Sequence, residues 1–262
     1  MRIHVVSDVH GNSDALARAG DGADVLVVLG DLINLVDYHD YSGGILGSLF
    51  GPKKVATLAH FRRSQMRAEL AEYSRRLWDG LDNAADMLRD AIREQYSRLF
   101  AAMTVPTYAT PGNVDAPELW SEFANDRLTV LDGAVAEIGG LRFGFVGGGL
   151  RNPADRGGRS DVWMPYLRTA DEYKAGVEKL TDVDVLCTHI PPAVPALTYD
   201  VVAGRPERGS EALLDLIIEQ QPRWSLFGHV HQPLSGRMRI GVTDCVNVGH
   251  FQRMQEPYVL RW

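Results

Sequence analysis

Cysteine is scarce in this sequence. Cys187 and Cys245 are its only two, and no Cys-x-x-C pair occurs. A disulfide framework, or a structural zinc site built on thiolates, needs more cysteines than this. Each of the two lies inside an apolar, strand-like run, so we expect both to be reduced residues of the core.

Long apolar runs are missing too. A membrane-spanning helix needs roughly 18 to 20 consecutive apolar residues, and no run approaches that length. The first strand-like run begins at Arg2, which leaves no room for a signal peptide. We therefore expect a cytoplasmic protein without a membrane partner.

Positive charge is in deficit, because the formal net charge is −7 at pH 7. This argues against a protein that holds nucleic acid on an extended cationic surface, although a small local site would still be compatible with it. Lysine supplies 4 of the 27 basic residues and arginine 23. An arginine in a loop is therefore weak evidence of function by itself.

The organisation of the chain predicts a single α/β domain over residues 1–262, with 45% hydrophobic residues to build its core. Strand, helix and strand follow one another near the start, which is typical of a parallel βαβ unit. Residues 35–50 have the composition of a loop, and after them apolar residues recur at helical spacing. We expect a helical insertion over 37–80 and two long helices before the third strand. We also expect the last strands of the chain to pair antiparallel.

Polar side chains recur where the strand-like runs end. The run Ile3–Val6 leads to Asp8 and His10, which in an extended chain point to the same side and can bind one ion together. Similar residues follow the later runs, and nearly all of them offer an oxygen or an imidazole nitrogen. The full set is Asp8, His10, Asp31, Asn113, His189, His229 and His231.

Such a set favours a metal centre. Carboxylates and imidazoles that converge in one cleft repel each other or stay poorly solvated unless a cation joins them. Ligation without thiolate suits Mn, Fe, Zn, Co or Ni. Two-metal hydrolases hold their ions roughly 3.5 to 4 Å apart around a nucleophilic water. Asp31, between Gly30 and Leu32 at the end of a buried run, is the natural carboxylate to bridge two ions.

The motifs resemble those of the calcineurin-like metallophosphoesterases. The family pattern of Asp-x-His, Gly-Asp, Gly-Asn, a lone His and Gly-His-x-His is met in that order between residue 3 and about residue 250. The matching stretches are Asp8-Val9-His10, Gly30-Asp31, Gly112-Asn113, His189 and Gly228-His229-Val230-His231. The resemblance implies two packed mixed β-sheets flanked by helices, a four-layer sandwich with the site at the strand ends.

The resemblance also implies two divalent transition-metal ions whose identity is left open. It places Asp8, His10 and His231 on the first ion, Asn113, His189 and His229 on the second, and Asp31 on both. It implies that Asp31, Asn113 and His189 serve catalysis, in which a metal-bridging hydroxide attacks phosphorus in line.

One position departs from the family pattern. Many members have Gly-Asn-His-Asp or Gly-Asn-His-Glu, in which the histidine is thought to protonate the leaving group or to stabilise the transition state. Here Val114 stands at that position and can do neither. Asp115 remains, and we expect it to orient a ligand or a water molecule.

Candidate substrate contacts follow from two further stretches. Arg151, Arg156 and Arg159 lie in a Gly-rich loop where arginine forks could clamp a phosphate, and an ordinary loop arginine is an equally good interpretation. His250 follows Asn247-Val248-Gly249 near the expected site, although a lone loop histidine is more often merely exposed.

The function predicted from the sequence is metal-dependent hydrolysis of a phosphate ester, most consistent with a phosphodiester. Phosphomonoesterase or phosphoprotein phosphatase activity is the alternative within the same class. A non-catalytic metal-binding scaffold is the alternative of another class, and the retention of all seven ligands argues against it. The apolar stripe of the inserted helix could cap the site, form a homo-oligomer seam or pack on the sheet, and we expect packing.

Overall fold

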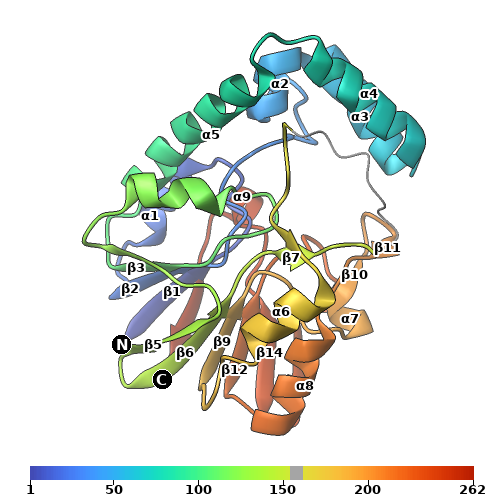
Figure 1. The fold of residues 1–262 in the computed structure, drawn as a ribbon. Helices are drawn as coiled ribbons and strands as arrows, with labels where there is room; N and C mark the ends of the chain where they lie inside the picture. The colour runs from blue at the N-terminus through green and yellow to red at the C-terminus, as the bar shows by residue number, and fades with distance from the viewer. Residues whose placement is uncertain (154–161) are drawn as a thin grey trace.

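The computed structural model describes residues 1–153 and 162–262, and it contains two large sheets that pack face to face (Figure 1). The first sheet has five strands in the order β15-β1-β2-β3-β4. Its parallel strands are β1 (Arg2–Val6), β2 (Val25–Val28), β3 (Thr107–Ala109) and β4 (Leu128–Val130), and β15 (Tyr258–Arg261) runs antiparallel to β1. The predicted βαβ unit is β1, α1 (Ser13–Ala19) and β2.

The second sheet has six strands in the order β13-β14-β12-β9-β6-β5. The four central strands, β14 (Thr243–Asn247), β12 (Trp224–Phe227), β9 (Val185–Thr188) and β6 (Leu141–Val146), are parallel, and β13 (Arg237–Ile240) and β5 (Ala134–Ile138) flank them antiparallel. The predicted antiparallel pairing is thus correct for β13 and β15. β14 also pairs antiparallel with β13, as predicted, whereas its other neighbour, β12, runs parallel to it.

The strands are apolar on both faces because each sheet is covered on both sides. In β2, Val25 and Val27 point between the sheets, whereas Leu26 and Val28 join the cluster under the helices of the other face. The second sheet is covered by α6 (Ala170–Val177) and α8 (Glu211–Gln220). The result is the predicted order of helix, sheet, sheet and helix. Cys187 and Cys245 are buried, free residues of β9 and β14, as expected.

Four helices, rather than the two expected, separate β2 from β3: α2 (Gly44–Phe50), α3 (Pro52–Arg63), α4 (Arg67–Asp79) and α5 (Ala84–Ala101). The sequence hides α2 because glycines interrupt its apolar pattern, although Ile45 and Phe50 are buried. Leu77 and Trp78 of α4 are buried in the cluster that extends from the first sheet, where Trp78 meets Phe50 of α2. Because α4 packs mainly on α3 and both helices lie away from the sheets in Figure 1, the expected packing of the stripe on the sheet itself is not confirmed. Among the described residues, no helix has both the length and the apolar character needed to cross a membrane.

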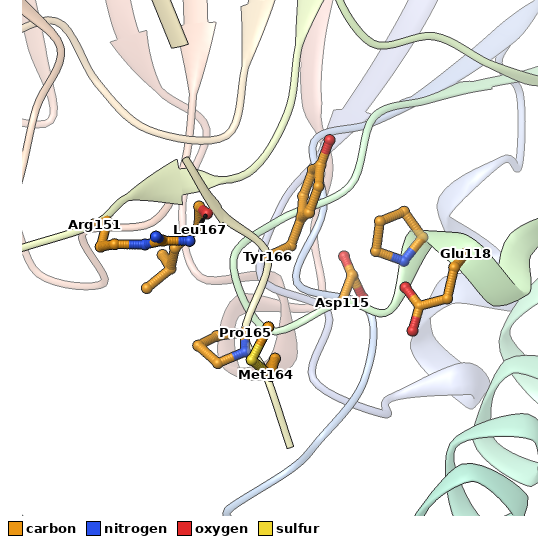
Figure 2. Close-up of a pocket in the computed structure, with 8 residues that line it drawn as sticks. Asp115, Glu118, Arg151, Met164, Pro165, Tyr166 and Leu167 are labelled. Carbon is orange, nitrogen blue, oxygen red and sulfur yellow. Dashed lines mark hydrogen bonds between the residues drawn. The ribbon is translucent and has the colours of Figure 1, made fainter. Parts of the chain in front are cut away.

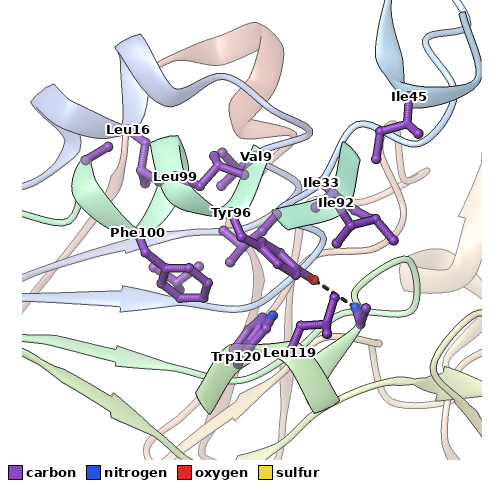
Figure 3. Packing of buried hydrophobic residues seen from close by; sticks show 14 of the residues in the cluster. Val9, Leu16, Ile33, Ile45, Ile92, Tyr96, Leu99, Phe100, Leu119 and Trp120 are labelled. Carbon is purple, nitrogen blue, oxygen red and sulfur yellow. Dashed lines mark hydrogen bonds between the residues drawn. The ribbon is translucent and has the colours of Figure 1, made fainter. Parts of the chain in front are cut away.

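Short elements complete the carboxyl edge of the sheets. They are η1 (Pro117–Phe123), the β7 (Gly149–Leu150) and β8 (Leu167–Arg168) pair, α7 (Pro195–Thr198), the β10 (Tyr199–Asp200) and β11 (Arg205–Pro206) pair, and α9 (Phe251–Met254). Around η1, an aromatic group of Tyr96, Phe100, Trp120 and Phe123 fills the space between α5 and the first sheet. Figure 3 shows Tyr96 and Trp120 in this group, with the Tyr96 hydroxyl turned toward the loop after β3.

Candidate metal centre

The seven predicted ligands all follow strands that end at one edge of the two sheets. Asp8 and His10 follow β1, Asp31 follows β2 and Asn113 follows β3; His189 follows β9, and His229 and His231 follow β12. The parallel direction of the strands within each sheet places their carboxyl ends together. The structure therefore brings together residues from both sheets and from both ends of the chain.

One group of contacts joins Asp8, His10, Asp31 and His231. The Nε2 atoms of His10 and His231 lie 3.3 Å apart. Oδ1 of Asp8 lies 3.3 Å from Nε2 of His231 and 3.9 Å from Nε2 of His10. Oδ2 of Asp31 lies 4.0 Å from Nε2 of His10. The His10 ring is held from behind, because its Nδ1 lies 3.3 Å from the carbonyl oxygen of Ile33.

A second group joins Asp31, Asn113, His189 and His229. Nε2 of His189 lies 3.4 Å from Oδ1 of Asp31 and 3.0 Å from Oδ1 of Asn113. Nδ1 of His189 lies 2.8 Å from the carbonyl oxygen of Leu29, so the ring is anchored on a strand end. The rings of His189 and His229 meet edge to face with centroids 5.1 Å apart. Asp31 is the residue common to both groups, with one oxygen toward each.

The backbone at the site is unusual. Asp8, His10, Asp31 and His229 have positive φ angles of 58°, 41°, 52° and 68°, a region that non-glycine residues rarely adopt. Each such residue typically costs on the order of 1 to 3 kcal/mol, and such residues cluster at functional sites where the surroundings over-determine the conformation. Four of the seven predicted ligands therefore sit on strained backbone.

The motif glycines are needed because backbone segments touch at the site. A Cβ atom on Gly30 would lie 2.0 Å from the amide nitrogen of Gly112, and one on Gly112 would lie 2.2 Å from Oδ1 of Asp31. On Gly228 it would lie 2.0 Å from Oγ of Ser7 and 2.3 Å from Oδ2 of Asp8. Any side chain at these positions would push the ligand loops apart.

The charges of the site are strongly coupled. Burial alone would raise the pKa of Asp8 and of Asp31, but contact with His231 and His189, respectively, holds both below the ordinary value. Burial would lower the pKa of His189, yet the charge of Asp31 raises it to about 9. Burial and the positive charge of His189 together lower the pKa of His229 to about 4. Two carboxylates are thus held as anions among nitrogens.

This arrangement fits divalent metal ions. Within the described part of the chain, the buried Oδ1 of Asp8 has no hydrogen-bond donor, although two imidazole nitrogens face it. A cation between these three residues would satisfy their lone pairs. A cation in the second group would take the place of the proton on His189. Potential ligand atoms of Asp8, Asp31 and His189 lie within 4.8 Å of one another, and so do those of His10, His231 and His250. Oxygen and imidazole donors suit the predicted transition metals.

Asp115 has a structural role that the sequence did not indicate. It is fully buried, and its carboxylate accepts hydrogen bonds from the amides of Leu32 (3.0 Å) and Gly112 (2.8 Å) and from the hydroxyl of Tyr96 (3.2 Å). Burial and the charge of Asp31 raise its pKa to about 6. These hydrogen bonds join the loops after β2 and β3, and the expected orientation of a ligand or water by Asp115 stays a prediction. Sequence reasoning missed Tyr96, whose only signal was its place in a helical stripe.

The structure describes two of the four predicted substrate contacts, Arg151 and His250. Arg151 is exposed just after β7 and lines a cavity of about 320 Å³ (Figure 2). Tyr166, another residue of the cavity wall, donates its backbone N–H to the carbonyl oxygen of Asn113. Arg156 and Arg159 lie outside the described residues. His250, which the sequence placed near the expected site, is buried against His231 with ring centroids 3.8 Å apart, and a contact between it and substrate stays a prediction.

Comparison with known proteins gives a consistent picture. A family model for calcineurin-like phosphoesterases matches residues 1–233. One solved structure is similar over 99% of this chain and 98% of its own length, with a TM-score of 0.62 and 16% identity. The crystal structure of TT1561 of Thermus thermophilus is similar over the same shares, with a TM-score of 0.52 and 16% identity. At such identity these two structures show the fold alone. No curated protein matches the sequence.

Proposed function

The chain belongs to the calcineurin-like phosphoesterase family and is a metal-dependent phosphoester hydrolase, and we propose that it hydrolyses a phosphodiester. The family uses two divalent metal ions. We assign Asp8, His10 and His231 to one ion, Asn113, His189 and His229 to the other, and Asp31 to both. The observation that supports this division is that Asp31 directs one oxygen toward each group of nitrogens.

The residues of the chain have separate tasks in this proposal. The bound ions supply Lewis-acid polarisation of a phosphoryl oxygen and activation of water. Asp31 holds the two ligand groups at a fixed separation, and Val114 keeps it in place by donating its backbone N–H to Oδ1 at 2.9 Å. His189 and Asn113 would hold the second ion on the buried side of the site, and they contribute to stabilising charge at phosphorus through that ion.

A diester is favoured by the cavity beside Asn113. The backbone N–H of Tyr166 donates to the carbonyl oxygen of Asn113 at 2.9 Å, so the cavity wall is attached to the ligand loop. Figure 2 shows Asp115 and Glu118 on one side of Tyr166 and Arg151 on the other. The lining residues are Asp115, Pro117, Glu118, Arg151, Met164, Pro165, Tyr166 and Leu167. A second ester group attached to phosphorus could occupy this space, with Arg151 available for a polar contact.

The test compares bis(4-nitrophenyl) phosphate with 4-nitrophenyl phosphate in the presence of Mn²⁺. We expect kcat/KM to be higher for the diester by about tenfold or more, since only the diester fills the cavity. Met164→Trp should narrow the cavity and reduce the diester rate, whereas Met87→Trp, at an exposed position of α5 outside the cavity, serves as the matched control. A higher rate for the monoester would favour the phosphatase alternative.

The scaffold alternative is separated by metal content. Protein purified without chelator should carry about two divalent ions per chain, and about zero ions would favour a scaffold. Assembly through the inserted helices and a cytoplasmic location remain predictions. Gel filtration of the full chain tests the first and fractionation of the native host cells tests the second.

A further inference from the structure

The residues that follow β14 contact both loops of the first ligand group, although they lie beyond the 233 residues that the family model matches. We refer to Asn247–Gln252 as the C-terminal brace. Its first residue reaches the loop after β12, because Nδ2 of Asn247 donates to the carbonyl oxygens of Val230 (2.9 Å) and Gly228 (3.3 Å). These two residues flank His229 and precede His231.

The other end of the brace holds the loop after β1. The amide of Phe251 donates to the carbonyl oxygen of Ser7, and the amide of Gln252 donates to that of Asp8, both at 3.0 Å. The side-chain Nε2 of Gln252 donates to the carbonyl oxygen of His10, also at 3.0 Å. One short segment therefore ties together two ligand loops that belong to different sheets.

His250 lies in the middle of the brace and packs on the ligand side chains themselves. Its ring stacks on that of His231, with centroids 3.8 Å apart and planes 17° apart, and meets His10 edge to face at 5.6 Å. The His231 side chain is 38% exposed, and within the described residues its Nδ1 has no hydrogen-bond partner. Metal-binding histidines are usually oriented by a hydrogen bond from that second nitrogen. The stacked ring of His250 is the contact that His231 makes on this side.

We propose that His250 is a positioning residue that holds His231 in its metal-binding orientation, a role that rests on the ligand assignment of the proposed function. The stacking itself argues against a role as a direct ligand. A nitrogen lone pair lies in the plane of its ring, so two nearly parallel rings stacked in this way do not direct their lone pairs at one ion about 2.1 Å from each nitrogen. A ring of similar shape without a nitrogen should therefore serve nearly as well.

The experiment measures binding of Co²⁺ to the full chain, by titration and by the visible spectrum of the bound ion. We expect the unmodified protein to bind two ions. His250→Ala should weaken one site by about tenfold, as loss of an orienting partner typically does, and leave the other site unchanged. His250→Phe, which preserves the stack, should restore affinity to within about threefold and leave the spectrum unaltered. Arg253→Ala, at an exposed neighbouring position, is the control.

Other outcomes overturn the proposal in distinguishable ways. If His250→Phe and His250→Ala weaken Co²⁺ binding equally and both change the spectrum, His250 is a ligand through its Nε2, which is buried and has no hydrogen-bond partner among the described residues. If Ala has no effect while two ions bind, the brace does not position His231. If the unmodified protein binds no Co²⁺, the ligand assignment of the proposed function fails, and the proposal about His250 fails with it. Thermal unfolding of each variant with chelator shows whether a loss of affinity reflects a loss of fold.

Discussion

The two ligand groups of this protein are built differently, although the same carboxylate belongs to both. The group around His189 is held firmly by the fold. His189 is fully buried, its Nδ1 contacts the carbonyl oxygen of Leu29 at the end of β2, and its Nε2 lies 3.0 Å from Oδ1 of Asn113. The group around His231 is more open and depends on a segment that enters the site from the far end of the chain. One group of the site is thus positioned by strand ends, and the other is positioned in addition by the C-terminal brace.

The largest expected effect is loss of the residue that the two groups share. Asp31→Ala should remove both ions and lower kcat/KM by about a thousandfold or more, whereas His10→Ala should lose one ion and retain measurable activity. Metal content by atomic emission, together with steady-state kinetics, provides the comparison. Equal residual activity and equal metal content in the two variants would contradict the shared carboxylate.

A second pair of variants separates the groups through their glycines. Gly112→Ala places a methyl group 2.2 Å from Oδ1 of Asp31, so both ions should be lost. Gly228→Ala places one 2.3 Å from Oδ2 of Asp8, so the first ion should be lost preferentially. Metal stoichiometry after dialysis distinguishes the two patterns. Gly140→Ala is the control, since a Cβ atom there meets open space, although its positive φ adds some strain.

The departure at Val114 predicts a dependence on the leaving group. Without an imidazole there, the departing oxygen leaves as an anion or takes a proton from water or from His250, because the oxygens of Asp115 accept hydrogen bonds within the protein. General acid catalysis contributes on the order of 100-fold or more, and most for poor leaving groups. Rates should therefore fall steeply as the leaving-group pKa rises.

The measurement is a series of substituted phenyl and alkyl esters. Val114→His should flatten the slope while the metal content stays at the unmodified level. The metal content should not change because Val114, which is half-buried, contacts Asp31 through its backbone N–H and not through its side chain. A shallow slope in the unmodified protein would mean that an acid is already present. In that event, His250→Ala should steepen it.

The smallest effect concerns the stability of the metal-free protein. In the folded state His189 has a pKa of about 9, above the unfolded value of about 6.5, so the proton it holds stabilises the fold below pH 6.5 and this contribution is lost as pH rises through 9. Asp8 and Asp31, whose pKa values are lowered, are ionised throughout this window and add no slope.

Chelator-treated protein should therefore lose unfolding free energy between pH 7 and pH 9, by an amount on the order of 2 kcal/mol. His189→Gln should remove that part of the slope, and denaturant unfolding at several pH values measures both. Saturation with Mn²⁺ should also reduce the slope, since the ion replaces the proton. The same slope in the variant would locate the proton elsewhere.

The grouping of the candidate ligands could be predicted from the sequence because these residues follow strands directly. An apolar run that ends in Asp8 or Asp31 indicates both the strand and the edge where its last side chains meet. The helix α2 was missed because its glycines break the apolar period. The role of Asp115 in joining the loops could not be predicted because its partners Leu32 and Tyr96 are 83 and 19 residues away in the sequence.

The sequence by itself determined most of the strands, the seven candidate ligands and the absence of an imidazole at Val114, because these depend on residue type and on periods of two or 3.6 residues. The four layers came from the resemblance of its motifs to a family. Only the tertiary structure decided that His250 stacks on His231 and that Gln252 holds the loop of His10. The first contact joins residues on either side of the β13–β14 hairpin, and the second joins residues 242 positions apart in the chain. No local pattern records them, since they exist only once both sheets have packed.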